Sequence, residues 1–477
     1  MYTLGIDLGT SGMKAALMDS SLRIVDECLE EYDIHLPQKG FAQQNPAEWY
    51  KTMETCLRRL DCSKVAGVGF SGQMHGLVMA DEHGDVLDEA ILWCDQRSTA
   101  QADEICSVIE ELGRRIYNRT ASGFMLASLL WIKQNQPELF HRIRRVMMPK
   151  DYLVWKMTGV FCTEPGDAVG SGALNLETME WDLQLLERLG IDAGLFPPVV
   201  PSEQVAGDTQ AELETLKQGI PVICGSGDHG MQLLGNGIFS PGTLSVNIGT
   251  SCQISGVVGV PSEFSCRELY LFAHPVGGYF SMTGTGYNGG GVFKWLRNTW
   301  YPGIPYRTLT DMAEKSVPGS NGVTFLPFLN GERGREELQG NFYGIRLTTT
   351  AADIIHACLE GIVFRIREYR EMLLEQGVDG NMIVLSGGAS ASPFWMQIIA
   401  DILQLPVYTG PFEQQAAAGA ALLAGMSVEV FPSPICLEQE LKGRMMCVAR
   451  PEENKHECYD RFYGQYRKLS STLFSGN

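Results

Sequence analysis

The chain has 477 residues, which is too long for one typical domain and predicts two or three. Hydrophobic residues make up 44% and charged residues 19%, a balance that supports sizeable cores and excludes a disordered chain. The formal net charge is −19, and no long run of Lys or Arg interrupts it. We therefore expect neither a nucleic-acid partner nor binding to an anionic membrane surface.

Location is indicated by what the sequence lacks. No apolar run reaches the roughly 18 residues that a membrane helix needs. The first residues, Met1–Asp7, form a strand-like pattern and not a signal peptide. The 13 cysteines are scattered through apolar segments without a Cys-x-x-Cys pair. This usage predicts reduced thiols, no zinc site and a cytoplasmic protein.

Short β-branched and apolar runs alternate with helical patterns, which is typical of an α/β fold. Helical spacing of apolar residues predicts a long helix over Ala351–Glu375. A proline near the start of the next apolar stretch predicts a helix over Pro393–Leu403, and a third is expected over Gln414–Leu423. Buried strands are predicted over Val65–Phe70, Pro221–Cys224, Thr243–Ile248 and Met382–Leu385.

The first strand pattern recurs about half a chain later. Leu4–Gly12 and Leu244–Cys252 both carry an apolar run into Gly-Thr-Ser, and another strand-like run follows each. A glycine between two strand patterns predicts a tight hairpin. Coincidence of a common tripeptide is one explanation. The other is a duplicated domain whose two hairpins hold a polyphosphate with backbone N–H groups and hydroxyls.

Asp7–Lys14 has the composition of a phosphate-binding loop. Its glycines let backbone amides approach a phosphate, Thr10 and Ser11 add hydroxyl donors, and Lys14 adds a positive charge. Asp7 is suited to hold Mg²⁺ directly or through water. No G-x-x-x-x-G-K-[ST] string occurs in the chain, so this is not a Walker A loop. An ordinary glycine hairpin is the alternative.

Gly225–Gly230 follows a predicted strand and fits the dinucleotide pattern G-x-G-x-x-G. Gly67–Gly72 and Gly284–Gly289 fit it too, so chance matching in a glycine-rich chain is the better explanation. Within this segment Asp228 lies at a strand end before an expected helix. It is either the N-cap of that helix or a base that takes a proton from a sugar hydroxyl.

Ser71–Gly76 also follows a predicted strand, and ligands of open α/β sheets bind at the carboxyl ends of strands. Gln73 and His75 offer donors and acceptors for hydroxyls, and Met74 offers an adaptable apolar wall. A structural histidine is the alternative for His75.

Two more segments complete the set. Trp93 and Asp95, with Arg97 nearby, suggest a polyol pocket, although a local ion pair between Asp95 and Arg97 is equally compatible with the sequence. Ser386–Ser392 lies between a predicted strand and a predicted helix. Its small residues would let a flat base lie on the backbone, and an ordinary strand–helix turn is the alternative.

In this order the motifs resemble the FGGY carbohydrate kinases, of the sugar kinase, heat-shock ATPase and actin superfamily, from Ile6 to about Gly425. Asp7–Lys14 is similar to the first phosphate loop of the family and Asn247–Ser251 to the second. Ser386–Ser392 is similar to the adenosine motif, and Gly340–Ile362 to the family signature, with Cys358 and Ile362 departing from the usual residues there.

The resemblance implies two ribonuclease-H-like domains, 1–239 and 240–477, with ATP and sugar in a central cleft. It implies Mg²⁺ with the ATP, Asp228 as general base, and a homodimer as in many relatives. The implied sugar-binding residues are Gln73, Met74, His75, Trp93 and Asp95. The implied ATP-binding residues are Thr10, Ser11, Lys14, Gly249, Thr250, Gly290, Lys294, Gly387, Gly388 and Ser392.

Within the family, Gly72–Gly76 is similar to the corresponding stretch of xylulose kinases, which predicts conversion of D-xylulose to D-xylulose 5-phosphate. Sedoheptulose kinases carry a similar string. Cys94 stands where xylulose kinases usually have Asn, and His229–Gln232 is bulkier than usual. Another ketose or polyol, such as ribulose, sedoheptulose or gluconate, therefore stays open. A non-catalytic sugar or ATP sensor and a nicotinamide dehydrogenase are the more distant alternatives.

Overall fold

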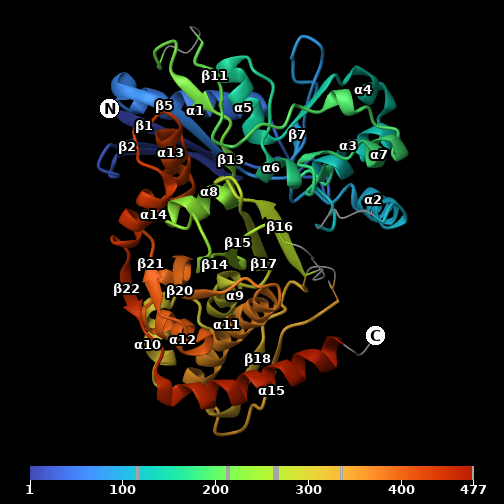
Figure 1. Cartoon of the computed structure of the whole chain (residues 1–477). Helices are drawn as coiled ribbons and strands as arrows, with labels where there is room; N and C mark the ends of the chain where they lie inside the picture. Colours follow the sequence, from blue (N-terminus) through green and yellow to red (C-terminus); the bar gives the residue numbers. More distant parts are fainter. Residues whose placement is uncertain (114–117, 211–214, 262–267, 333–334, 336, 475–477) are drawn as a thin grey trace. The chain divides into compact units, whose positions relative to one another are not determined.

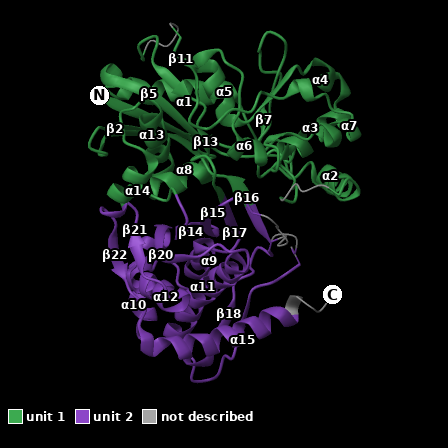
Figure 2. Cartoon of the chain, viewed as in Figure 1, with its two compact units in different colours: residues 1–239, 271–280, 412–441 green, residues 240–270, 281–411, 442–477 purple. Residues whose placement is uncertain are grey.

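The computed structural model describes residues 1–113, 118–210, 215–261, 268–332, 335 and 337–474 (Figure 1). The chain divides into two compact units (Figure 2). Unit 1 holds residues 1–239, 271–280 and 412–441, and unit 2 holds 240–270, 281–411 and 442–477. Whether 1–239 and 240–477 fold as separate domains stays a prediction.

Unit 1 is built on a sheet in the order β11-β12-β5-β1-β2-β3, with β13 also pairing with β5. The β1–β2 and β2–β3 pairs are antiparallel, whereas β1–β5 and β5–β12 are parallel. The strands are β1 (Tyr2–Leu8), β2 (Gly12–Asp19), β3 (Ile24–Glu31), β5 (Val65–Gly72), β11 (Val205–Asp208), β12 (Pro221–Ile223) and β13 (Ser226–Gly227).

Unit 2 is built on a sheet in the order β17-β15-β14-β20-β21-β22. Strand β16 (Leu269–Ala273) begins in unit 2 and ends in unit 1. Again a hairpin, β14–β15, is followed by parallel strands, β14–β20 and β20–β21, and an antiparallel edge strand. The strands are β14 (Gly242–Ile248), β15 (Cys252–Val258), β17 (Phe280–Gly286), β20 (Gly380–Gly387), β21 (Val407–Thr409) and β22 (Met446–Ala449).

The strand order around each hairpin is therefore the same, as a duplication predicts. The hairpins differ in one respect. Leu8 pairs with Met13 across the first turn, whereas Ile248 pairs with Cys252 across the second, so the first turn is one residue longer. That extra residue lets the Gly9 N–H donate to the Gly12 carbonyl oxygen, at 3.0 Å, within the first turn.

The long helices lie where apolar periodicity and capping residues predict them. α11 and α12 have the expected bounds, and the third predicted helix begins at Gln415 and continues to Ser427. Thr350 and Asp353 form a capping box at the start of α11, and Ser392 caps α12 by accepting from the Trp395 N–H at 3.3 Å. The four predicted strands are confirmed as β5, β12, β14 and β20, with ends shifted by one or two residues.

Helices and short strands complete the two units (Figure 1). Unit 1 contains α1 (Pro46–Arg59), α2 (Thr99–Glu111), α3 (Met125–Asn135), α4 (Pro137–Arg142), α5 (Pro149–Thr158), α6 (Pro165–Val169), α7 (Leu183–Arg188), α8 (Asp228–Gly235) and α13 (Gln415–Ser427), with α14 (Pro434–Lys442) at its edge. Its short strands are β4 (Gln43–Gln44), β6 (Val78–Ala80), β7 (Ala90–Ile91), β8 (Arg145–Met147), β9 (Leu174–Asn175) and β10 (Glu180–Trp181). Unit 2 contains α9 (Gly290–Trp300), α10 (Tyr306–Ala313), α11 (Ala351–Glu375), α12 (Pro393–Leu403), α15 (His456–Phe474), β18 (Thr324–Leu326) and β19 (Asn341–Tyr343).

Helix α13 joins unit 1 through contact between small residues. It packs against β1, β5 and α8. A Cβ added to Gly5 on β1 would lie 1.9 Å from the Ala417 carbonyl oxygen, and one on Gly69 of β5 would lie 2.2 Å from that of Ala420. Only glycine on the strands lets the helix backbone approach this closely. The fully buried Leu4, Ile6 and Leu8 on β1 belong to the core of the same unit.

Two features of the described parts of the chain concern membrane-spanning helices and disulfide bonds. Over these residues no helix is long and apolar enough to cross a membrane. Every cysteine that the structure describes is a free thiol.

Candidate active site

In unit 1 the first hairpin turn is held by three side chains from elsewhere in the chain. Tyr32 donates its hydroxyl to the Gly9 carbonyl oxygen at 2.5 Å. Gln44 donates its amide to the Thr10 carbonyl oxygen at 2.7 Å, and Trp93 donates its indole N–H to the Thr10 hydroxyl at 2.9 Å. Ser11 follows at the exposed tip of the turn. The predicted phosphate loop is thus a braced turn.

Asp7 and Lys14 lie directly opposite each other on β1 and β2, so their side chains share one face of the sheet. Asp7 is 6% exposed, and its Oδ1 accepts a hydrogen bond from the Ser71 hydroxyl at 2.7 Å. Burial raises the pKa of Asp7, while the Ser71 hydrogen bond and the Lys14 charge oppose that rise. The structure thus brings together the predicted metal carboxylate and the predicted phosphate-binding lysine.

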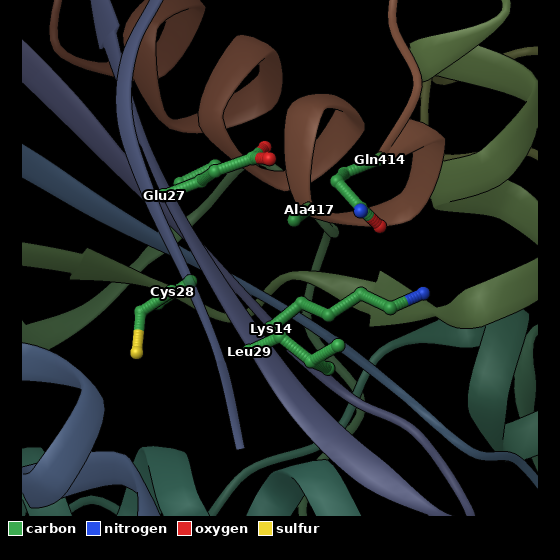
Figure 3. Close-up of a pocket in the computed structure, with 8 residues that line it drawn as sticks. Lys14, Glu27, Cys28, Leu29, Gln414 and Ala417 are labelled. Carbon is green, nitrogen blue, oxygen red and sulfur yellow. The ribbon is translucent and has the colours of Figure 1, made fainter. Parts of the chain in front are cut away.

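Figure 3 shows Lys14 in a small pocket of unit 1 on the side of β2 and β3 that α13 covers. The amide of Gln414, which precedes α13, and Ala417 line the pocket beside the Lys14 side chain. On β3 the pocket meets Glu27, Cys28 and Leu29. Of the predicted sugar and nucleotide residues of unit 1, only Lys14 lines this pocket. This pocket is therefore not the sugar site.

The carboxyl ends of three neighbouring strands place Asp228 beside Asp7. Asp7 pairs with Ser71 between β1 and β5, and Ser71 pairs with Ser226 between β5 and β13. Asp228 follows β13 directly and is the first residue of α8. The N-cap of α8 is Gly227, with no side-chain capping bond. The alternative that Asp228 caps this helix is therefore wrong.

The environment of Asp228 shifts its acidity toward neutral pH. Burial raises the pKa of Asp228 to about 7, and the charge of Asp7 adds to the rise, while a hydrogen bond from the His229 backbone opposes it. Burial also lowers the pKa of His229 and of His274 to about 4, so both rings are neutral near pH 7. A carboxyl group that titrates near neutral pH is suited to proton transfer.

Gln73, Met74 and His75 leave the end of β5 on the same side of the sheet as Asp228. Met74 packs on Gly227, where an added Cβ would lie 2.6 Å from the Met74 Cγ. His75 has a φ of 72° and donates from Nδ1 to the Gly170 carbonyl oxygen, at 2.7 Å. Its ring stacks on Phe124, with centroids 4.1 Å apart. These contacts fix Met74 and His75 beside the start of α8.

Phe272 extends the aromatic wall around His75. Its ring centroid lies 6.2 Å from that of His75 and 5.3 Å from that of His229. The segment 271–280 that carries Phe272 is anchored in unit 1 by Asn118, whose side chain exchanges two hydrogen bonds with the Leu271 backbone, at 2.7 and 2.8 Å. Sequence reasoning missed Phe124 and Phe272, because neither lies in a motif.

Asp95 and Trp93 differ in how their side chains are engaged. Both carboxylate oxygens of Asp95 are occupied by the Arg97 guanidinium, at 2.8 to 3.0 Å, and by the Ala42 and Arg97 N–H groups. The Arg97 guanidinium lies 3.7 Å from the Phe41 ring centroid. This geometry favours the ion-pair alternative for Asp95, and its contact with sugar stays a prediction. Trp93 is 42% exposed and offers a ring face.

A buried ionic cluster that the sequence did not predict supports the Asp228 segment. Lys150 is fully buried, and its Nζ lies 2.6 Å from Asp151, 3.6 Å from Asp167 and 3.8 Å from Glu164. Glu164 accepts hydrogen bonds from the N–H groups of Gly166 and Asp167, from the Ser202 hydroxyl, and from the Gly227 N–H at 3.3 Å. The cluster therefore holds the residue that precedes Asp228.

In unit 2 the second hairpin turn receives the N-terminus of α9. The Gly290 N–H donates to the Gly249 carbonyl oxygen at 2.6 Å, and the Gly291 N–H donates to that of Thr250 at 3.0 Å. A Cβ added to Gly290 would lie 2.6 Å from the Gly249 carbonyl oxygen, and one added to Gly291 would lie 2.8 Å from the Thr250 carbonyl oxygen. Gly249, Thr250 and Gly290 are thus brought together. Lys294, about one turn further along α9, has an exposed side chain.

The predicted adenosine residues of unit 2 lie at the end of β20. Gly387 has a φ of 81° and pairs with Ile248, and an added Cβ would lie 2.5 Å from the Ile248 carbonyl oxygen. Gly388 follows in the turn, and Ser392 caps α12. Gly387 and Gly388 are therefore next to the second hairpin, and the hydroxyl of Ser392 is engaged by its own helix.

A divalent cation fits these residues only together with a phosphate ligand. Among the described residues no group of three or more His, Cys, Asp or Glu side chains could hold a metal ion. Mg²⁺ usually keeps several waters and binds through one or two carboxylates plus substrate phosphates. The single carboxylate of Asp7, with Lys14 opposite, suits an ion that arrives with a polyphosphate.

Comparisons with known proteins agree with this arrangement. The N-terminal domain model of the FGGY family of carbohydrate kinases matches residues 2–235, and the C-terminal domain model matches residues 244–428. The xylulose kinase of Staphylococcus epidermidis is 31% identical over 481 residues, covering 98% of this chain and 96% of that protein.

Solved structures agree at the level of the whole chain. The crystal structure of a xyloylose kinase from Brucella ovis has a TM-score of 0.93 and 29% identity, with full coverage of both chains. The gluconate kinase of Lactobacillus acidophilus has a TM-score of 0.91 at 24% identity, covering 100% of this chain and 98% of that one, which shows a shared fold alone.

Proposed function

We propose that this chain, which belongs to the FGGY family of carbohydrate kinases, phosphorylates a ketose with ATP and that this ketose is D-xylulose. Membership of the family makes the protein a sugar phosphotransferase. Its mixed α/β fold is that of sugar kinases with the actin and hexokinase type of ATPase fold, as the sequence predicted. Support for D-xylulose comes from the similarity to the xylulose kinase of S. epidermidis and from the Gln73–His75 stretch.

The placement of Asp228 carries the proposed mechanism. It follows a strand end, lies near Asp7, and has Met74 packed on the residue before it. With its pKa raised to about 7, the Asp228 carboxylate accepts the proton of the attacking sugar hydroxyl as the bond to phosphorus forms. Met74, His75 and the face of Trp93 orient the sugar, and the Gln73 Oε1 accepts a hydrogen bond from one of its hydroxyls.

Charge in unit 1 supports a neutral polyhydroxyl substrate. The carboxylates of Asp7, Asp167 and Asp228 interact electrostatically there, and the one buried cation of the cluster, Lys150, is shared by Asp151, Glu164 and Asp167. His229 is neutral near pH 7 because burial lowers its pKa to about 4. A sugar acid such as gluconate would find the one buried cation of the cluster already shared by three carboxyl groups, whereas a ketose donates hydroxyl hydrogens to the acceptors.

For the nucleotide, we propose that the amides and hydroxyls of Thr10 and Ser11, with Lys14, bind the phosphates. Asp7 would hold the Mg²⁺ of Mg-ATP directly or through water, and the metal would supply charge neutralisation at the phosphates. In unit 2 the proposed contacts are Gly249, Thr250 and Gly290 for phosphate, Gly387 and Gly388 for adenosine, and Lys294 and Ser392 by position. A homodimer and a cytoplasmic location stay predictions.

The test is ADP release with Mg-ATP across D-xylulose, D-ribulose, L-ribulose, sedoheptulose, xylitol, glycerol and gluconate. The highest kcat/KM on D-xylulose, with gluconate among the poorest, is the expected result. A preference for another ketose would support the assignment as a kinase and would indicate that Cys94 and His229 determine which sugar is preferred. A preference for gluconate would contradict the charge argument, and no ADP release on any member would contradict the proposed substrate class.

A further inference from the structure

Gln44 lies at the centre of a buried chain of hydrogen bonds in unit 1. It is 1% exposed on β4, and its Oε1 accepts from the Trp49 indole N–H and from the Gln73 amide, both at 3.1 Å. Its Nε2 donates to the Thr10 carbonyl oxygen at 2.7 Å and to the Asp33 carbonyl oxygen at 3.2 Å. One side chain therefore touches both the hairpin turn and the segment after β5.

The orientation of both amides follows from the chemistry of their partners. An indole N–H can only donate, and a backbone carbonyl can only accept. Trp49 therefore fixes the oxygen of Gln44, and the carbonyls of Thr10 and Asp33 fix its nitrogen. Since Gln44 presents its oxygen to Gln73, the Gln73 amide must donate through Nε2.

This leaves the Gln73 Oε1 as a buried acceptor. Gln73 is 1% exposed, and its Oε1 has no hydrogen-bond partner among the residues that the structure describes. A buried carbonyl without a donor is unfavourable, so a ligand that donates to it gains more than it would in water. A sugar hydroxyl is such a donor.

We propose that Gln44 is a positioning residue that couples the binding of the two substrates, an inference that rests on the proposed function. A sugar hydroxyl that donates to the Gln73 Oε1 fixes the Gln73 amide. That amide adds a restraint to Gln44, which its other hydrogen bonds already hold, and through Gln44 to the Thr10 carbonyl of the hairpin turn. A nucleotide that binds after the sugar then meets a more restrained hairpin, which makes its binding tighter.

A second link between the same two regions limits how much Gln44 contributes. Trp93 donates to the Thr10 hydroxyl at 2.9 Å, but it is 42% exposed, whereas Gln44 and Trp49 are buried. Water competes with an exposed hydrogen bond more effectively than with a buried one. The larger share of the coupling therefore passes through Gln44.

The experiment measures the affinity of a non-hydrolysable ATP analogue with Mg²⁺ by calorimetry, with and without saturating D-xylulose. Coupling free energies of this kind correspond to about 5- to 150-fold in affinity. We expect the sugar to tighten nucleotide binding by at least about fivefold in the parent protein. Reciprocally, the nucleotide tightens sugar binding by the same factor, which is an internal check.

Gln44→Glu separates coupling from binding. Glutamate keeps an oxygen that accepts from Trp49 and Gln73. It loses the N–H groups that donate to the Thr10 and Asp33 carbonyl oxygens, and a carboxylate oxygen then faces the Thr10 carbonyl. We expect the coupling factor to fall below about twofold, with the affinity for sugar alone nearly unchanged. Gln73→Met should weaken sugar binding and also remove the coupling, and the double variant should show no further loss of coupling.

The matched control is Gln101→Glu, which makes the same change at another buried glutamine of unit 1. Gln101 on α2 donates to Gln134 at 2.7 Å and belongs to neither proposed binding region. Its coupling factor should equal that of the parent. If Gln44→Glu does not fold, Trp49→Phe removes the donor that orients Gln44 while keeping an aromatic ring, and it should lower the coupling factor at least twofold.

The outcomes distinguish this inference from the proposed function. No sugar-dependent ADP release by the parent protein would refute the proposed function itself. A parent that is active, with the same coupling factor in Gln44→Glu or Trp49→Phe as in the parent, would overturn the role of Gln44. A coupling loss that also occurs in Gln101→Glu would overturn it too, because the effect would not be specific to this chain of hydrogen bonds.

Discussion

Activity should depend on pH through Asp228. The base must be deprotonated to accept a proton, so kcat/KM should fall as pH falls through the pKa of the free enzyme. With that pKa at about 7, about one carboxyl in eleven is ionised at pH 6 and about ten in eleven at pH 8. We therefore expect kcat/KM for the sugar to rise roughly tenfold from pH 6 to pH 8.

The environment decides this magnitude, because an exposed aspartate with the ordinary pKa of 3.8 would give a flat profile over the same range. The fall of kcat/KM between pH 8 and pH 6 is the acid limb of the profile. His229 and His274 cannot produce this acid limb, because burial lowers their pKa to about 4. The assay is ADP release at subsaturating D-xylulose and subsaturating Mg-ATP, so that the free enzyme is the species that titrates.

His75→Asn serves as the control for the remaining nearby ring. Asparagine tolerates the positive φ of this position and can still donate to the Gly170 carbonyl oxygen. The acid limb should persist in this variant. A kcat/KM that changes less than about twofold between pH 6 and 8, or a limb that disappears with His75→Asn, would refute the assignment of the limb to Asp228.

Two further predictions concern the supports of the site. Lys150→Met leaves three buried carboxylates without their shared cation. The free energy of unfolding of unit 1, measured in a denaturant titration, should fall by about 3–5 kcal/mol. A loss under about 1 kcal/mol would contradict the role of the cluster. Gly290→Ala places a Cβ 2.6 Å from the Gly249 oxygen and should raise KM for ATP several-fold with little change in KM for sugar. Gly464→Ala on α15, where an added Cβ meets no atom within 4 Å, is its control, and equal KM values in both variants would count against the nucleotide contact.

Elements with strong local signals could be predicted from the sequence. The apolar periodicity of α11 and the proline at the start of α12 predicted the bounds of these helices. Gly-Thr-Ser after two similar strand patterns predicted both hairpins. These features depend on residues close together in the chain. The one-residue difference between the hairpin turns depends on strand register, which the tripeptide does not specify.

Features that depend on distant partners could not be predicted. Glu164 precedes a proline, a pattern that indicates a helix N-cap, but its bond to the Gly227 N–H joins residues far apart in the sequence. Asp95 had two compatible interpretations, and only the position of Arg97 and of the Ala42 N–H distinguishes them. The close approach of Ala417 to Gly5 likewise requires knowing which helix covers β1.

The measurement that tests the central claim most directly is kcat of Asp228→Asn with saturating D-xylulose and Mg-ATP. Asparagine has nearly the same shape but cannot accept the proton, so kcat should fall by about 10²- to 10⁴-fold. Binding of the ATP analogue should stay close to that of the parent protein, because Asp228 is not among the proposed nucleotide contacts. A kcat within about twofold of the parent value would contradict the account.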